Sequence, residues 1–525
     1  MDDPSFLGDL FRRTQPSLTL LLMQLMIGFM ESIDMCAWQK VVGSDGESTE
    51  CRYACLLFLL AAIFFQCTAF ASDPENTVQL KPDQNVSALV NSAPAGTTFV
   101  FSPGTYRMQS IVPKNNDAFI GNGAIMNGGK LLEMQPDGGR WSAVVPVAQS
   151  DPAHCAKDHP RCGILNDLFI DDQVQAPADS LSEIGPGRWF YDDSSGKAYI
   201  STDPAGHKVE FSMTTAAFSG TATGVQISHL VVEKYATPPQ NGAIGGNLHA
   251  VVTAERSTGS AQNWKVLNTE VRWSHGGGIV LGASGHVESC NVHDNGQLGV
   301  AGHGTNVVIL NNEIANNNYA GFDPDWEAGA TKFSGTDNLV VRSNYVHDNN
   351  GNGLWTDIDN IHTLYEKNKV INNKGEGLRH EISYDAIIRN NLLKGNKAGI
   401  VVVLSPNVEV YGNVIEVPAN GIDGIRIANG QRGVGAYGPH IAHDDHVHNN
   451  IITYLGPAGR SGLSGPLATA TGVTFDSNEY HIIGGGDNHW IWSSGAETIS
   501  AMHQAGLEQH ATISKAPSSM PDPTH

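Results

Sequence analysis

The sequence predicts an all-β fold in which short parallel strands stack coil upon coil, a single-stranded right-handed parallel β-helix. The first observation is an Asn followed by a short apolar strand, which recurs at Asn268, Asn291, Asn312, Asn344, Asn368, Asn391, Asn413 and Asn450. Five of the seven separations lie between 21 and 24 residues, and the two longer ones indicate insertions on single coils. The second observation is a polar turn, such as HDNG or KGNKAG, that leads each time into a strand beginning with Gly. Such coils cannot bury their apolar faces alone, so they must stack.

Composition fits a loop-rich globular chain. Of 525 residues, 58 are Gly, 40% are hydrophobic and only 16% are charged. The 53 acidic residues outnumber the 31 basic ones, which gives a formal net charge of −22. Binding to nucleic acid requires a basic face, so this charge argues against a nucleic-acid partner.

Residues 1–71 are interpreted as an N-terminal extension and signal peptide. The apolar stretch 56–70 follows Arg52 and ends with Ala69-Phe70-Ala71, which is the order of a secretory signal and its cleavage site. We expect cleavage after Ala71, with Met35 as the true start, and export to the periplasm, cell surface or medium. An N-terminal membrane anchor is the alternative. No later segment resembles a membrane span.

After the signal, the mature chain keeps three cysteines. Cys155 and Cys162 lie in a short polar loop without a second Cys/His pair at zinc spacing, which favours a disulfide in an exported protein. Cys290 is expected to be a buried packing thiol.

Breaks in the repeat divide the mature chain. Residues 72–133 are expected to form the first coils. Residues 134–212 lose the rhythm, and GRWFYDDSSGKAYISTDP indicates a small inserted β domain. The main β-helix then covers 213–500, and 501–525 form a tail whose Pro/Ser-rich end is expected to be disordered.

The Gly-led strands, aligned on their Gly, are GIVLG (278–282), GVAGHG (299–304), GFDPDWE (321–327), GLWTDID (353–359), GLRHEIS (377–383), GIVVVL (399–404) and GIRIAN (424–429). The residue after Gly is apolar in every strand, so it is expected to face the core. Side chains alternate along a strand, so the second and fourth residues after Gly face outward. The second-position column is Val280, Ala301, Asp323, Trp355, Arg379, Val401 and Arg426. The fourth-position column is Gly282, His303, Asp325, Asp357, Glu381, Val403 and Ala428.

Charged residues gather on three or four consecutive strands of these columns. Like charges in register about 4.8 Å apart are unfavourable, so an ordinary surface should avoid Asp325, Asp357 and Glu381 in one column. The pattern therefore indicates a functional site. His380, next to these residues, is expected to point inward.

Adjacent strands suit one reaction class in particular. Retaining glycosidases place two carboxyl groups about 5–5.5 Å apart, one as nucleophile and one as general acid/base. Asp357 and Glu381, one strand apart, fit this separation, and the negative charge of Asp325 is expected to raise a neighbour's pKa. We therefore favour an exported retaining glycoside hydrolase that acts on a polysaccharide or oligosaccharide and requires no cofactor.

The repeat, together with AGTTFVFSPGTY (95–106), resembles the pectate-lyase-like (pectin-lyase-like) superfamily over about residues 75–500. The strands LWTDIDN and RHEISYD resemble those of β-helix glycosidases such as the β-helix β-xylosidases. This resemblance implies Asp357 as the nucleophile and Glu381 as the acid/base. Trp355 is interpreted as a sugar-stacking platform and Arg379 as a donor to substrate hydroxyls.

Uronate chemistry, by a lyase or C5-epimerase, is the competing interpretation. YAGFDPD (319–325) is similar to the Y-G-F-D-P-H signature of mannuronan epimerases, with Asp325 at the position of the catalytic His. His303 is a substitute base, and Lys332, Arg379 and Arg426 are candidates to hold a uronate. The charge of −22 disfavours a polyanionic substrate unless calcium intervenes.

Two further alternatives stay open. Calcium is a possible cofactor, with oxygen ligands from Asp323, Asp325, Asp357 and Asp359. A non-catalytic carbohydrate-binding or adhesin β-helix is the third function class, although such proteins usually carry long polar ladders without a local group of carboxylates.

Overall fold

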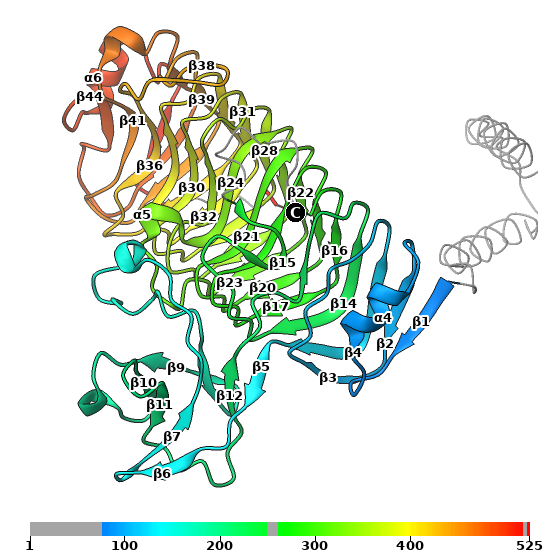
Figure 1. Cartoon of the computed structure of the whole chain (residues 1–525). Coiled ribbons are helices and arrows are strands. Elements are labelled where there is room, and N and C mark those ends of the chain that lie inside the picture. Colours follow the sequence, from blue (N-terminus) through cyan, green and yellow to red (C-terminus); the bar gives the residue numbers. More distant parts are fainter. Residues whose placement is uncertain (1–75, 249–260, 518–521, 525) are drawn as a thin grey trace, which may run out of the picture. The chain divides into compact units, whose positions relative to one another are not determined.

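A computed structural model describes residues 76–248, 261–517 and 522–524. It confirms the parallel β-helix: three rows of short parallel strands run the length of the coils (Figure 1). Two rows belong to one 24-stranded sheet, because the long strands β4 (Ala118–Asn127) and β14 (Gln226–Glu233) span both. The third row is an 11-stranded sheet, which we call the site sheet.

The first row contains β16 (Lys265–Leu267), β19 (His286–Glu288), β22 (Val308–Leu310), β25 (Val340–Arg342), β28 (Thr363–Glu366), β31 (Ala386–Arg389), β34 (Val408–Tyr411), β39 (His446–His448) and β42 (Thr474–Asp476). The second row contains β17 (Glu270–Arg272), β20 (Asn291–His293), β23 (Glu313–Ala315), β26 (Tyr345–His347), β29 (Lys369–Ile371), β32 (Leu392–Lys394), β35 (Val414–Val417), β40 (Ile451–Tyr454), β43 (Glu479–Ile482) and β45 (Thr512–Ser514). The site sheet contains β13 (Phe218–Ser219), β15 (Gly242–Gly245), β18 (Gly277–Leu281), β21 (Leu298–Thr305), β24 (Gly329–Asp337), β27 (Leu354–Asp357), β30 (Glu376–Glu381), β33 (Ala398–Val403), β36 (Asp423–Ala428), β41 (Arg460–Ser464) and β44 (Trp490–Ser493).

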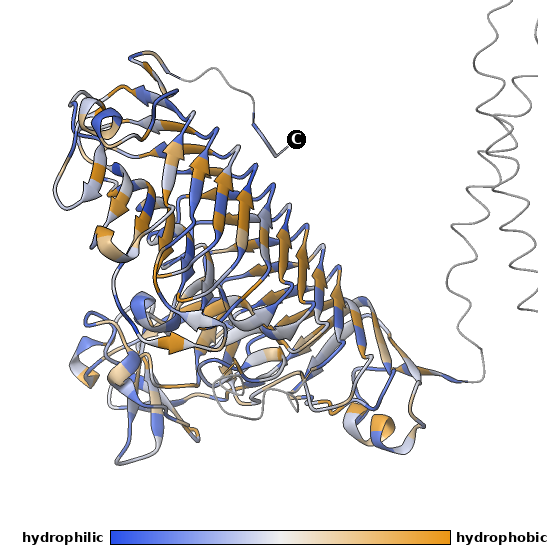
Figure 2. Ribbon diagram, turned by 90° about the horizontal axis from the view of Figure 1, so that it is seen from above, coloured by the Kyte–Doolittle hydropathy of each residue, from blue (hydrophilic) through white to orange (hydrophobic). Residues whose placement is uncertain are grey.

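One continuous core fills the coils. Except in the last strand, β45, the middle residue of each three-residue strand in these rows is buried and stacks on its equivalent in the next coil, as Val266, Val287, Ile309 and Val341 do. Figure 2 shows the hydrophobic segments of successive strands lying side by side in these rows. The first coils contain β1 (Thr77–Leu80), β2 (Thr98–Phe101), β3 (Gly104–Arg107) and helix α4 (Val86–Ser92), and helix α6 (Ile499–Gln504) buries Met502 at the other end.

Buried asparagines join the coils at two turns. In the first ladder, the backbone N–H and the side-chain amide of each Asn donate to Oδ1 of the Asn one coil further on; its members are Asn312, Asn344, Asn368, Asn391, Asn413, Asn450 and Asn478. The prediction that Asn268 and Asn291 belong to this ladder is wrong. Both side chains are exposed, and Cys290 occupies the turn position, where its N–H donates to Asn312. Cys290 is a buried free thiol, as predicted.

A second ladder lies at the corner that leads into the site sheet. It consists of Asn295, Asn317, Asn349, Asn373 and Asn396, each linked to the next in the same way. In the sequence, these residues lie in the polar turns that lead into the Gly-led strands.

The third predicted Gly-led strand, GFDPDWE, is also wrong. Residues 324–327 form the short helix α5 (Pro324–Glu327), with Asp323 as its N-cap, and the strand of this coil is β24, which begins at Gly329. The physical reason is Pro324, which has no N–H to donate to the neighbouring strand. Asp323 and Asp325 therefore do not belong to the outward columns.

An inserted domain interrupts the coils between β4 and β14. Its strands form an eight-stranded sheet in the order β5, β12, β8, β9, β10, β11, β7 and β6 (Figure 1). Their bounds are β5 (Gly129–Leu131), β6 (Gln135–Asp137), β7 (Arg140–Val144), β8 (Leu168–Ile170), β9 (Gln173–Pro177), β10 (Arg188–Asp192), β11 (Lys197–Ile200) and β12 (Val209–Ser212). The sheet has a core of its own around Trp189 and Phe211. Cys155 and Cys162, which were expected to pair, form a disulfide in this domain.

The predicted tail from residue 501 is not separate from the coils. Strand β45 pairs with β43, and Nζ of Lys369 lies 3.0 Å from Oδ2 of Asp522. The predicted signal peptide, Met35 and the cleavage site at Ala71 lie outside the described residues. Within the described part of the chain, no helix is long and apolar enough to cross a bilayer.

We predict that Asn368→Ala destabilises the fold strongly, whereas Asn291→Ala does not. The Asn368 side chain is fully buried and accepts from Asn344 while donating to Asn391. Each buried partner left without a hydrogen bond costs about 1–3 kcal/mol, so we expect a loss of at least about 2 kcal/mol. Asn291 is exposed, so its variant should change stability by less than about 0.5 kcal/mol. Urea unfolding midpoints check this, and equal midpoints would show that the ladder contributes little.

Candidate active site

The outward face of the site sheet contains two columns rich in charged side chains. Strands β24, β27 and β30 are in register, so Ser334, Asp357 and Glu381 are neighbours in one column. In the other column, Trp355 lies beside Arg379, which is followed by Val401 and Arg426. The predicted pair Asp357 and Glu381 therefore occupies directly opposite positions on adjacent strands, which lie about 4.8 Å apart.

Lys332 fixes the Asp357 carboxylate. Its side chain is almost fully buried, and its Nζ lies 2.6 Å from Oδ2 of Asp357 and 3.9 Å from Oε1 of Glu327. The other oxygen of Asp357, Oδ1, is buried and has no hydrogen-bond partner. A buried carboxylate is stable only when it is paired, and here Lys332 is the charged partner. One oxygen is thus held by Lys332, and the other is buried and has no hydrogen-bond partner.

Trp355 is not available as a sugar-stacking platform. The indole is 2% exposed, and the Lys332 ammonium lies 3.4 Å from its ring centroid. The Arg379 guanidinium lies 5.6 Å from the same centroid. These cation–π contacts support Lys332 beside Asp357, so Trp355 positions charged groups instead of presenting its face to a substrate.

Glu381 accepts from two arginines. Arg379 Nε lies 2.8 Å from Oε2, and Arg432 Nη1 lies 2.9 Å from Oε1. Burial by itself raises the pKa of Glu381, but Arg379, Lys332 and Arg432 outweigh it, and the net shift is downward. The expectation that Asp325 raises this pKa is wrong, because Asp325 lies on α5 and the groups that act on Glu381 are cations.

Arg379 is also bound on its other side. Its Nη1 lies 2.9 Å from Oε2 of Glu376, and Glu376 Oε1 lies 4.0 Å from Nη2 of Arg426. Arg426 Nε lies 3.3 Å from Oδ2 of Asp423. A hollow of about 160 Å³ adjoins this network and is lined by Asp325, Glu376 and Arg379. Asp325 is thus near the site, although it is outside the columns.

A loop between β36 and β39 contacts the residues that follow strands β27 and β30 of the site sheet. It contains the two-stranded hairpin β37 (Val434–Gly435) and β38 (Gly438–Pro439). Asp359 Oδ1 accepts from the N–H of Ala436 and lies 3.0 Å from Nε2 of His440, and the Tyr384 hydroxyl donates to Gly438 O. These contacts hold the loop that carries Arg432.

His303 lies in the column of Ser334 but is not next to the carboxylate pair. It pairs with Ser334, which in turn pairs with Asp357. Its Nε2 is buried without a hydrogen-bond partner, and burial lowers the pKa of the imidazole. His303 is therefore a neutral imidazole at pH 7. His380 points into the core as predicted, where Thr356 lies 2.7 Å from Nδ1 and burial lowers the pKa to about 3.

The four aspartates predicted as calcium ligands do not meet. Asp323 caps α5, Asp325 lies on that helix, Asp357 is paired with Lys332, and Asp359 is bound to the hairpin loop. Within the described residues, no group of three or more His, Cys, Asp or Glu side chains is placed to hold a metal ion.

Sequence reasoning missed Lys332 as the direct partner of Asp357, and it missed Arg432, Glu376 and Asp423 altogether. The position of Lys332 was readable, because GATKF also begins with Gly and the competing segment contains Pro324. Arg432 offered no signal, since a long loop brings it to Glu381 from 51 residues away.

Comparison with known proteins agrees with this architecture. Residues 256–415 match the family model described as the right-handed beta helix region. XylC, solved in complex with xylose, is 15% identical, with a TM-score of 0.61 over 84% of this chain and 86% of that chain. The A-module of the mannuronan C-5 epimerase AlgE6 from Azotobacter vinelandii is 13% identical, with a TM-score of 0.44 over 83% and 93%. The PL6 family polysaccharide lyase Pedsa3628 from Pseudopedobacter saltans is 10% identical, with a TM-score of 0.41 over 83% and 92%. No curated protein matches the sequence.

The fold is therefore a right-handed parallel β-helix. At these identities the likeness is one of fold, so the function must be argued from the site.

We predict that the stabilising contribution of Glu381 depends on pH. Its pKa is lower in the folded state than in the unfolded chain, so the contribution is present above the unfolded value of about 4.3 and disappears as the pH falls through the folded value. Glu381→Gln should therefore lower the urea midpoint at pH 7 much more than at pH 3. Glu416→Gln, on β35, is the control and should change the urea midpoint little at pH 7. An equal loss at both pH values for Glu381→Gln would contradict the ion-pair account.

Proposed function

We propose that the chain is an exported carbohydrate-active enzyme and a retaining glycoside hydrolase, with Asp357 as nucleophile and Glu381 as general acid/base. The observation that carries the proposal is the in-register pair on β27 and β30, in which Asp357 keeps one buried oxygen without a partner. Adjacent strands give a carboxyl separation of the size that retaining enzymes use. The match in fold to XylC, solved with xylose, is compatible with a glycoside substrate.

The two carboxylates have environments that suit different roles. Lys332 holds Oδ2 of Asp357, which orients the carboxylate and leaves Oδ1 to attack the anomeric carbon. Glu381 has to deliver a proton to the leaving oxygen, so it has to be protonated when the substrate is bound. Arg379 first, and then Lys332 and Arg432, lower the pKa of Glu381 and favour its ionised form. In the proposed mechanism the substrate displaces the half-exposed Arg432, and the pKa of Glu381 rises as that cation leaves.

Uronate lyase or epimerase activity is the second candidate, and a specific observation favours it. His303 is a neutral, buried imidazole with an unpartnered Nε2, in the column of Ser334. Such a group can abstract a proton next to a carboxylate, while Lys332 or Arg379 neutralises that carboxylate. Against it, both of these cations are already paired with acidic side chains.

We predict that Glu381→Gln and Asp357→Asn each lower glycoside hydrolysis by about 10²–10⁴-fold, because each removes a group that acts in the transition state. The mature chain is incubated with neutral and uronic oligosaccharides, and reducing ends and ultraviolet absorbance are followed together. Proton NMR of the first product should show a retained anomeric configuration. Glu416→Gln is the control and should keep full activity.

Other outcomes of this experiment decide against the hydrolase. Absorbance from an unsaturated product, lost in His303→Gln and kept in Glu381→Gln, would replace it with the lyase. Inversion of the uronate C5 centre without cleavage would indicate an epimerase. Inverted products would reject the retaining assignment.

We predict that Arg432→Gln moves the alkaline limb of the pH–rate profile to higher pH, by up to about one unit. Removing this cation raises the pKa of Glu381, so the acid form persists at higher pH. Arg389→Gln on β31, which is paired with Glu366 on another face, is the matched control and should leave the profile unchanged. An unchanged limb in Arg432→Gln would show that Glu381 is not the titrating acid.

A further inference from the structure

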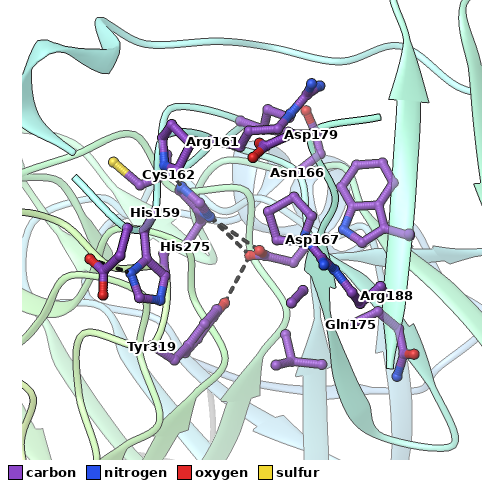
Figure 3. A pocket seen from close by; sticks show the side chains of 18 residues that line it. His159, Arg161, Cys162, Asn166, Asp167, Gln175, Asp179, Arg188, His275 and Tyr319 are labelled. Atoms are coloured by element: carbon purple, nitrogen blue, oxygen red, sulfur yellow. Dashed lines mark hydrogen bonds and ion pairs between the residues drawn. The ribbon is translucent and has the colours of Figure 1, made fainter. Parts of the chain in front are cut away.

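A pocket of about 240 Å³ lies where the inserted domain meets the coils (Figure 3). The inserted domain supplies most of its wall, including Asp167 and Trp189, and the coils supply His275 and Tyr319. Asp357 and Glu381 do not line it. The volume is below the roughly 300–1,000 Å³ typical of pockets for drug-sized ligands, so the pocket has room for a single small molecule.

A buried hydrogen-bond network forms one wall. The Asp167 carboxylate accepts from the Tyr319 hydroxyl at 2.8 Å and lies 3.1 Å from Nδ1 of His275, as the dashed lines in Figure 3 show. The other ring nitrogen, Nε2, lies 2.8 Å from the carbonyl oxygen of Cys162. Burial alone lowers the pKa of His275, but the charge of Asp167 outweighs it and the net shift is upward. The carboxylate is therefore held rigidly, and two donors do not exhaust the acceptor positions of a carboxylate.

Trp189 also lines the pocket. Trp189 is 1% exposed, and its indole Nε1 is buried without a hydrogen-bond partner. A buried N–H that lacks a partner costs free energy, which a ligand oxygen would recover. The side chains of Gln175, Asp179 and Arg188 also line the pocket and provide both donors and acceptors.

The charges around the pocket balance. Asp158, Asp167 and Asp179 oppose Arg161, Arg188 and His275, whose two ring nitrogens both face oxygen acceptors. This balance gives no preference for an anion or a cation. Ile164, Val174 and the Trp189 ring also line the pocket and add apolar surface. Hydroxyl groups both donate and accept, and a sugar ring also presents apolar C–H faces, so the mixture fits a small polyhydroxylated molecule.

We propose that this pocket binds one neutral sugar ring, independently of the carboxylate pair on the site sheet. The inserted domain is then a binding module whose site is completed by the coils.

Calorimetric titration of the full chain tests the proposal. Glu381→Gln is titrated with xylose, glucose and glucuronate, so that turnover does not interfere. We expect saturable binding of a neutral sugar, with glucuronate at least about tenfold weaker than glucose because the pocket has no excess positive charge. Trp189→Phe, added to Glu381→Gln, keeps the ring but removes the N–H, and should weaken binding about tenfold. Trp141→Phe, in the same domain but outside the pocket, is the matched control and should bind normally.

Asp179→Asn is the second variant and keeps the test decisive if Trp189→Phe does not fold. It removes a charge from an exposed rim residue, so it should fold normally and weaken neutral-sugar binding severalfold. Absence of saturable binding, or binding unaffected by either variant, would overturn the proposal and leave the Asp167–His275 network a purely structural link between domain and coils. Tighter binding of glucuronate would overturn the neutral-ligand assignment. Failure to find hydrolysis leaves this binding result unaffected, so the two proposals fail separately.

Discussion

The hydrogen-bonded asparagine ladders determine which side chains meet on this molecule. In each ladder, two N–H groups of one coil donate to a single Oδ1 of the next, so successive coils are joined at a fixed residue. The ladder that includes Asn349 and Asn373 stands at the corner directly before β27 and β30. A shift of one residue along a strand would turn every outward side chain inward. The pairing of Asp357 with Glu381 therefore depends on hydrogen bonds made at the preceding turn.

This register also explains how several charged side chains tolerate burial on one face. The two outward columns place cations beside carboxylates: Lys332 beside Asp357, and Arg379 beside Glu381. Desolvation of each charge costs several kcal/mol, and only close partners offset it. The formal net charge of the whole chain is −22, yet the charged groups nearest to the buried carboxylates of the site are cations. Local pairing sets their protonation more than net charge does.

The fold was predictable because the geometry of a coil requires certain residue types at fixed positions, and these recur in the sequence from coil to coil. The columns of Asp357 and Glu381 followed from alternation alone, and the structure keeps that register. The strand was misplaced at 321–327 because this long repeat unit contains two segments that begin with Gly, GFDPDWE and GATKF. Only Pro324 in the first segment indicates that the second one is the strand. The prediction for Asn291 was wrong for another reason. Whether an Asn beside a strand points inward depends on the turn conformation, which composition does not specify. Arg432 and the Asp167–His275 contact join residues 51 and 108 positions apart through loops, and no periodicity encodes such contacts.

The segment 318–328, which includes the wrongly predicted strand at 321–327, links the inserted domain to the site sheet. At its start, Tyr319 bonds to Asp167, and a Cβ on Gly321, whose φ is +79°, would lie 2.2 Å from Cγ of His159. In its middle, Phe322 packs with Cys162, so the disulfide loop rests on the coils. At its end, Glu327 lies 3.9 Å from Nζ of Lys332. Because the segment is bound at both ends, the inserted domain fixes the surroundings of Lys332, and through Lys332 those of Asp357. The extra residues on this coil therefore help to build the site, although none of them belongs to its columns.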